Sequence, residues 1–247
     1  MFRWASRDEL VPAGVYHGLL AVDGLQRGRS QARETEPVGP VPEEHVSAVL
    51  PLLSQQVRTM VQVQELAAMR PQDIRNLRTG DLDMTSDVWV YTPWTHKTEH
   101  HGHQRRIAIG PRAQVLLRPF LKPDAPTAYV FSPREAIALI RAERCAHRKT
   151  RRTPSELRRR AKPNPKRAPG ERYTKAGYET AIYKACKKAG VPSWAPNRLR
   201  HNCATRVRRL YGLDGAAAVL GHRLGTVTEV YAESDLKKAI DIMRAIG

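Results

Sequence analysis

The chain has 247 residues, and its 42 Lys and Arg against 24 Asp and Glu give a net charge of +18. A balance this basic excludes an ordinary acidic enzyme and indicates a polyanionic partner, of which nucleic acid is the simplest. The sequence has no run of about 18 apolar residues and no signal-peptide core, and its three scattered cysteines suit a reducing compartment. We therefore expect a soluble protein of the cytoplasm with no membrane partner.

The first part of the chain differs in composition from the rest. Residues 1–41 are rich in Gly, Pro and charge and are too few to enclose a core, so we expect a linker that follows a remnant of another domain. Helical spacing of apolar residues begins after Pro42. Pro51 should break or kink this first helix before a second apolar run that ends near Leu66. The main domain is therefore predicted to cover 42–247.

Short β-rich runs follow these helices. VWVY at 88–91 and RIAI at 106–109 predict two strands joined by a long hairpin loop, and AYVF at 128–131 predicts a third strand. Helices are expected near 111–121 and from Pro133 onward. The pattern predicts a mainly helical α+β domain with a small sheet.

Residues 141–172 interrupt the pattern. They hold thirteen Lys and Arg against three Glu, together with four prolines. Self-repulsion and proline predict a mobile basic insertion. It would follow a DNA backbone through a group of arginines, or alternatively be a solvated insertion that only raises solubility. The arginines that we assign to DNA contact are Arg151, Arg152, Arg158, Arg159 and Arg160.

Helical signals return at Thr174, a good N-cap, and the helix that it starts should end at Gly190. The last segment carries Leu236, Ile240, Met243 and Ile246 on one apolar stripe, which is typical of an amphipathic helix. The further helices expected after Gly190 cover 198–211 (ended by Gly212), 214–220, about 226–231, and 233–247.

Four side chains form a constellation that suits phosphate chemistry. Arg70 directly precedes Pro71 and should lie outside regular helix, and Arg200 lies in NRLRHNCATRV. His222 follows 22 residues later in a glycine-flanked turn, and Tyr231 follows after nine more. Two guanidinium groups can bracket a phosphate, a histidine can donate to it, and a tyrosine can attack it. Each residue alone is weak evidence, whereas their order and spacing are specific.

The sequence resembles the catalytic domain of the tyrosine recombinases, the phage integrase family. The resemblance covers about residues 42–247 and rests on AAMRPQDIRNL, the hairpin with HKT, NRLRHNCATRV and LGHRLGTVTEVY. It implies an integrase-type catalytic core, double-stranded DNA as partner, and strand cleavage through a 3′-phosphotyrosyl intermediate. No metal and no cofactor are expected, because arginines supply the positive field at the phosphate.

The resemblance implies roles for single residues. Arg70 and Arg200 correspond to the two catalytic arginines, His222 to the second histidine position, and Tyr231 to the nucleophile. A hydroxyl from another strand would then reverse the covalent step, which amounts to recombination.

Three further positions concern the same site. Lys97 matches the family's β-hairpin lysine, and Asp73 matches the acidic residue that braces the site. Asn197 departs from the family, which usually has histidine there. Asparagine cannot accept a proton at neutral pH, and loss of a general base typically costs about 10²–10⁴-fold in rate. His201, about 100° round the helix from Arg200, is interpreted as structural.

Two other features have competing interpretations. The histidines of the hairpin loop suggest zinc, but their spacing is poor and no cysteine is near, so a polar loop that faces DNA is favoured. The apolar stripe of the last helix would by default pack on its own domain, while the resemblance implies docking on a neighbour in a DNA-bound tetramer. The histidines are His96, His100, His101 and His103.

Two alternatives to an active recombinase stay open. Asn197 and the short N-terminal segment favour a weakened or non-catalytic DNA-binding relative, and a type IB topoisomerase would share the chemistry. The resemblance implies a further helical domain before the catalytic one. Residues 12–22 would hold only the last helix of that further domain. The chain would then be a natural truncation, a fragment, or the product of a wrongly placed start site.

Overall fold

The computed structural model describes residues 1–247 apart from 27, 30, 35, 96–104, 160–167 and 222–228, and for 229–235 it describes the backbone alone. The chain divides into two compact units, Met1–Val38 and Gly39–Gly247. In the described part of the chain, no helix combines the length and the apolar character that crossing a membrane requires.

The first unit is a pair of short helices. Its α1 (Phe2–Arg7) and α2 (Ala13–Leu20) pack on each other, and the Leu10 N–H donates to the Ala5 carbonyl at 2.8 Å. Ala5 is buried, but most of the other large apolar side chains are exposed, Trp4 by 53%. The unit therefore has almost no interior, as expected for so few residues.

The second unit begins with four short helical elements. These are α3 (Glu43–Val49), the 3-10 turn η1 (Leu50–Leu52), α4 (Gln55–Leu66) and α5 (Pro71–Asn76). The predicted break at Pro51 is confirmed, since the 3-10 turn separates the two longer helices there. Buried side chains of α4, among them Met60, Val61 and Val63, lie in the main core.

A small antiparallel sheet lies beside these helices. Its strands are β1 (Leu82–Asp83), β2 (Trp89–Tyr91) and β3 (Ile107–Ile109), in that order across the sheet. Trp89 pairs with Ile109 and Tyr91 with Ile107, so both strands predicted from 88–91 and 106–109 are confirmed.

The strand predicted at 128–131 is wrong. This segment makes one bridge, between Arg78 and Tyr129, and the Val130 N–H donates to the Leu77 carbonyl at 2.9 Å. Val130 and Phe131 are buried in the core, so the apolar run serves packing alone. The chain enters a helix at Pro133 before a ladder can extend.

The basic segment is more regular than predicted. After α6 (Pro111–Leu117) and the turn η4 (Arg118–Phe120), α7 runs from Pro133 to Ala146, and α8 (Pro154–Arg158) follows. Ala, Leu, Ile, Glu and Arg favour helix in α7 despite the charge. A capping box starts α8, because the Thr153 side chain accepts from the Glu156 N–H and the Glu156 carboxylate accepts from the Thr153 N–H. The loop predicted for 141–172 is therefore wrong at 141–146 and 154–158, which are helical, while its mobility stays a prediction.

Helix α9 (Lys175–Ala189) has the predicted ends. The Thr174 hydroxyl accepts from the Gly177 N–H at 3.0 Å, and Gly190 takes a left-handed conformation with φ 71°. Tyr178, Ile182 and Ala185 are buried on one face, and α9 packs on α3.

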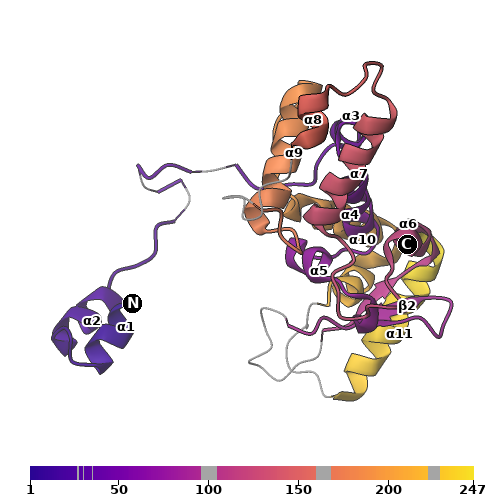
Figure 1. The fold of residues 1–247 in the computed structure, drawn as a ribbon. Helices are drawn as coiled ribbons and strands as arrows, with labels where there is room; N and C mark the ends of the chain where they lie inside the picture. Colours follow the sequence, from indigo (N-terminus) through magenta and orange to yellow (C-terminus); the bar gives the residue numbers. More distant parts are fainter. Residues whose placement is uncertain (27, 30, 35, 96–104, 160–167, 222–228) are drawn as a thin grey trace. The chain divides into compact units, whose positions relative to one another are not determined.

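Two elements complete the chain (Figure 1). Helical residues run from Asn197 to Leu220 in α10, but Gly212 has φ 73° and ψ −173°, so this is two helices that meet at the predicted glycine. The last helix, α11, runs from Glu229 to Ile246 as one element. The separate helices predicted at 226–231 and 233–247 are therefore corrected to a single helix.

Helix α11 packs on its own domain. Its buried side chains Ala239, Ile242 and Met243 lie in a second apolar cluster with residues of α10, including Cys203 and Val207. Figure 1 shows α11 beside the sheet, and β3 contacts it. The stripe predicted to dock on a neighbouring protomer is thus used within the chain, because it covers apolar surface of α10 and β3.

The end of α11 fits closely against the start of α6. A Cβ atom added to Gly110 would lie 2.0 Å from the Met243 carbonyl oxygen. We expect Gly110→Ala to lower the free energy of unfolding by about 1–3 kcal/mol, because the end of α11 must move. Chemical denaturation measures this loss. Gly39→Ala, whose Cβ would have no neighbour within 4 Å, is the control, and equal effects of the two changes would contradict the packing described here.

Candidate active site

The first part of the site is the start of α5. Pro71 forces Arg70 into an extended conformation, with φ −71° and ψ 153°, and this ends the connection from α4. The Asp73 carboxylate reaches back and accepts from the Arg70 N–H at 3.0 Å. Asp73 is buried and Arg70 is half-buried. The backbone of Arg70 is therefore fixed by the acidic residue one turn later.

Arg105, which lies two residues before β3, binds the same carboxylate. Its Nη2 lies 2.9 Å from Oδ2 of Asp73, and its Nε donates to the same oxygen at 3.1 Å. Arg105 is not among the site residues predicted from the sequence. One signal could have identified it: by strand alternation, residue 105 shares a face with Ile107 and Ile109, which are core residues. A charged residue at that position needs a buried partner.

Arg200 lies in the first turns of α10 and is 7% exposed. Its Nη1 donates to the Ala68 carbonyl and its Nη2 to the Leu220 carbonyl, each at 2.6 Å. Ala68 lies just past the end of α4 with φ 51°, and Leu220 is the last residue of α10. Both carbonyls belong to helix C-termini, which carry partial negative charge.

The contact between Arg200 and Leu220 depends on the reversal at Gly212. In a straight helix, residues 20 positions apart would be separated by about 30 Å. Gly212, whose positive φ and extended ψ are open mainly to glycine, turns the second half of α10 back toward the first. Arg105 Nη1 also approaches the Leu220 carbonyl oxygen, at 3.4 Å. Leu220 thus connects Arg200 and Arg105.

The result is a cluster of three guanidinium groups, from Arg70, Arg105 and Arg200, around one carboxylate. Burial, followed by the nearby charges of Arg105 and Arg70, lowers the pKa of Arg200 to about 9. Burial and Arg105 also lower the pKa of Arg70, against the effect of Asp73. Among the described side chains of the cluster, three guanidinium groups and one carboxylate, that of Asp73, leave an excess of positive charge. Such an excess favours binding of an anion.

The structure brings together only part of the predicted set. Lys97 and His222 lie outside the described residues, as do Arg160 and the four hairpin histidines. For Tyr231 the structure gives the backbone, which lies in the first turn of α11. Asn197, the first residue of α10, is exposed and precedes Arg200 by one turn. His201 is also exposed.

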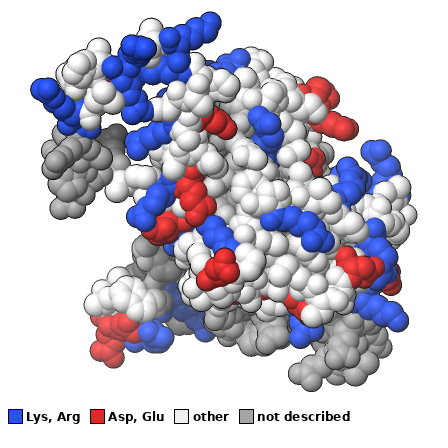
Figure 2. All heavy atoms as spheres, turned by 45° about the vertical axis from the view of Figure 1, so that its right-hand side comes forward, with Lys and Arg blue, Asp and Glu red and all other residues white. Residues whose placement is uncertain are grey.

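The other predicted arginines belong to the α7–α8 region. Arg151, Arg152, Arg158 and Arg159 are all exposed. Figure 2 shows a group of basic side chains at the upper edge of the molecule, the height at which Figure 1 places α7 and α8. Figure 2 also shows basic and acidic residues interspersed over the rest of that face.

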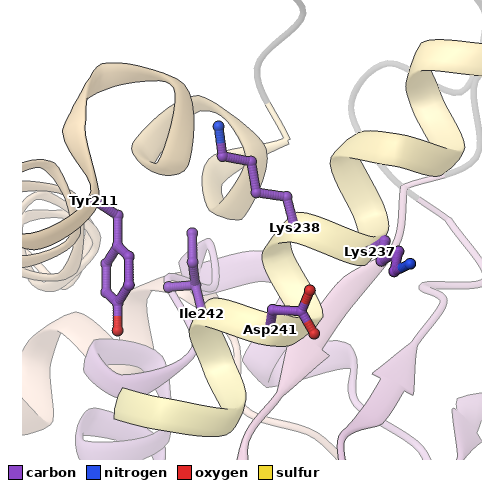
Figure 3. Close-up of a pocket in the computed structure, with 5 residues that line it drawn as sticks. All are labelled: Tyr211, Lys237, Lys238, Asp241 and Ile242. Carbon is purple, nitrogen blue, oxygen red and sulfur yellow. The ribbon is translucent and has the colours of Figure 1, made fainter.

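A separate hollow lies between α10 and α11 (Figure 3). Its volume is about 430 Å³, and it shares no residue with the guanidinium cluster. It is lined by Tyr211, Lys237, Lys238, Asp241 and Ile242.

Comparison with known proteins identifies relatives of this fold. The model of the phage integrase family matches residues 44–238. The integrase from mycobacterium phage Brujita matches with 14% identity and a TM-score of 0.56, over 100% of this chain and 68% of that one. The Tn1549 transposon integrase in complex with circular intermediate DNA matches with 14% identity and a TM-score of 0.52, over 92% and 76%. At these identities the solved structures show the fold alone. No curated protein gives a significant match.

The two carbonyl contacts of Arg200 predict a stability effect. We expect Arg200→Lys to lower the free energy of unfolding by about 2 kcal/mol, because one ammonium cannot reach both buried carbonyls. Arg198 is a matched control on the same helix, since its guanidinium also donates to two carbonyls, those of Gly39 and Pro40, each at 2.8 Å, but at a half-buried position. Arg198→Lys should cost less, because water replaces the lost bond. Urea unfolding of both variants tests this, and equal losses would speak against the role of burial.

Proposed function

This chain belongs to the phage integrase family, and from that premise we propose that it is a site-specific DNA recombinase that cuts and rejoins duplex DNA through a phosphotyrosyl link. The observation that carries this proposal is the guanidinium cluster of Arg70, Arg105 and Arg200. Phosphoryl transfer requires mainly positioning and stabilisation of negative charge. A cluster of three guanidinium groups around one carboxylate, with Arg200 and Arg105 bound to carbonyls at helix ends, supports such a role.

In the proposed reaction, the Tyr231 hydroxyl attacks the scissile phosphodiester. A bond forms between the phenol oxygen and phosphorus, the phenol proton is released, and the bond from phosphorus to the 5′ oxygen breaks. Lys97 donates the proton that the departing 5′ oxygen takes up. Arg70, Arg200 and His222 stabilise the charge on the non-bridging oxygens. A 5′-hydroxyl from another strand then reverses the step without an external energy source.

Asn197 favours a second candidate function. Asparagine can donate a hydrogen bond to a phosphate oxygen but cannot act as a base, so a DNA-binding relative with weak or absent cleavage is the alternative. A type IB topoisomerase would share the covalent step and rejoin the original strand. Joining to a foreign strand is the property that separates a recombinase from both.

Double-stranded DNA is the proposed partner, and several copies of the chain are proposed to assemble on it. Among the described apolar side chains of α11, those of Ala239, Ile240, Ile242, Met243 and Ile246 are already packed within the chain. A tetramer would therefore require either another contact surface or release of α11 from its own domain.

The proposed nucleophile, Tyr231, can be tested by trapping the covalent adduct. On a nicked duplex, which traps the cleaved state, we expect the native chain to form a covalent adduct visible by denaturing gel electrophoresis. Tyr231→Phe should abolish the adduct and leave the dissociation constant for DNA unchanged, because only the attacking oxygen is lost. Tyr183→Phe, at an exposed position on α9, removes the same group elsewhere and should leave the adduct unaffected.

An adduct that survives in Tyr231→Phe would remove Tyr231 from this role. No adduct with the native chain, together with tight DNA binding, would favour the non-catalytic alternative. Transfer of the bound strand to a foreign 5′-hydroxyl would support the recombinase over the topoisomerase.

The basic arm, by which we mean residues 141–172, can be tested through the salt dependence of DNA binding. We propose that its exposed arginines contact the DNA backbone. Each phosphate contact contributes about 0.9 to the slope of log K against log salt. Replacing the four arginines by Ala should therefore lower that slope by up to about 3.6, as measured by fluorescence anisotropy at several salt concentrations. The four are Arg151, Arg152, Arg158 and Arg159.

The matched control removes the same charge from α9, where four lysines are exposed. If the control lowers the slope as much as the arm variant, the arm contributes only general charge and the proposal fails. The four lysines are Lys175, Lys184, Lys187 and Lys188.

A further inference from the structure

One oxygen of Asp73 accepts two hydrogen bonds and lies against a third nitrogen. Its Oδ2 accepts from the Arg70 backbone at 3.0 Å, from Arg105 Nε at 3.1 Å, and lies 2.9 Å from Arg105 Nη2. The Asp73 side chain is 2% exposed and that of Arg105 is 8% exposed. This is therefore a buried pair in which both partners are held in fixed geometry.

The position of this carboxylate raises an electrostatic problem. Asp73 is needed to fix the backbone of Arg70 at the start of α5, yet a buried negative charge beside Arg70 and Arg200 attracts their guanidinium groups. A phosphate would then compete with Asp73 for them. A third cation that pairs with the carboxylate removes this competition.

Arg105 meets that requirement. Two of its nitrogens lie on Asp73, and its Nη1 lies 3.4 Å from the Leu220 carbonyl oxygen, which also accepts from Arg200. It thus contacts the segment that positions Arg70 and the segment that positions Arg200. Neither of these contacts requires a bound anion.

We propose that Arg105 is a positioning residue that neutralises Asp73, so that this carboxylate can hold the backbone of Arg70 without cancelling the charge that Arg70 and Arg200 present to phosphate. The inference rests on the proposed function in that the phosphate is taken to be that of DNA. It adds a residue outside the set of Arg70, Lys97, Arg200, His222 and Tyr231 that the family resemblance implies.

A double-mutant cycle tests this role. Arg105→Met removes the charge and keeps much of the side-chain volume, whereas Asp73→Asn keeps an oxygen that can accept from the Arg70 N–H. The cycle compares the native chain, both single variants and the double variant. Arg106→Met, at the adjacent and exposed position, removes the same charge and is the control.

Two measurements are made on each protein. The first is the rate of covalent adduct formation on the nicked duplex. The second is binding of inorganic phosphate at low ionic strength, followed by ³¹P NMR, with an Arg70→Met/Arg200→Met protein to identify the signal of this cluster. Thermal unfolding confirms that each variant is folded.

We expect Arg105→Met to slow adduct formation by about 100-fold and to weaken phosphate binding by about tenfold. Arg106→Met should resemble the native chain. In the Asp73→Asn background, Arg105→Met should change either quantity less than about threefold, because no buried carboxylate remains to be neutralised.

Two results would overturn the inference: Arg105→Met behaving like Arg106→Met, or Arg105→Met causing the same loss whether residue 73 is Asp or Asn. If Arg105→Met alone does not fold, the pair of proteins with Asn at position 73 still decides, because a structural role for Arg105 predicts a large loss there. A native chain that forms no adduct but shows the expected phosphate pattern would refute the proposed function and leave the inference standing.

Discussion

The buried guanidinium of Arg200 is the interaction on which the rest of the site depends. A charged group at 7% exposure is tolerated only when its donors are satisfied. Here the acceptors are two carbonyls at the ends of α4 and α10. Helix ends have carbonyls without partners in the helix, so the arginine and the helices satisfy each other.

That constraint determines the local backbone. The Ala68 carbonyl meets Arg200 from a residue in a left-handed conformation, an uncommon state for a residue other than glycine. The Leu220 carbonyl meets it only because Gly212 reverses α10. Ala68 precedes Arg70 by two residues in the sequence, and Leu220 precedes His222 by two. The contacts that satisfy one buried cation therefore also set the positions from which other site residues start.

Much of this fold could be predicted from local signals. The cap at Thr174, the end at Gly190 and the reversal at Gly212 depend on residues close in sequence, and the structure has all three. The motif around Arg70 and Asp73 was likewise readable, because Pro71 dictates the conformation before it. The ion pair of Arg105 with Asp73 was not, since it joins residues 32 positions apart and has no local signature. The helices within the basic arm were missed because charge and proline predict an irregular loop. Helix propensity nevertheless extends α7 to Ala146, and a capping box is enough to start α8.

Helix α11 has a geometric consequence for the residue at its start. Because Glu229–Ile246 is one unbroken helix, Tyr231 and Ile246 are opposite ends of a rod in which they lie about 22 Å apart. The far end is clasped, since the Arg112 N–H donates to the Gly247 carbonyl at 2.7 Å and Gly110 leaves no space beside Met243. Because α11 is one continuous helix, a small change in its tilt near Met243 would displace the backbone near Tyr231 by a larger distance. The position of the Tyr231 backbone is therefore set in part by the contacts that the far end of α11 makes with the start of α6.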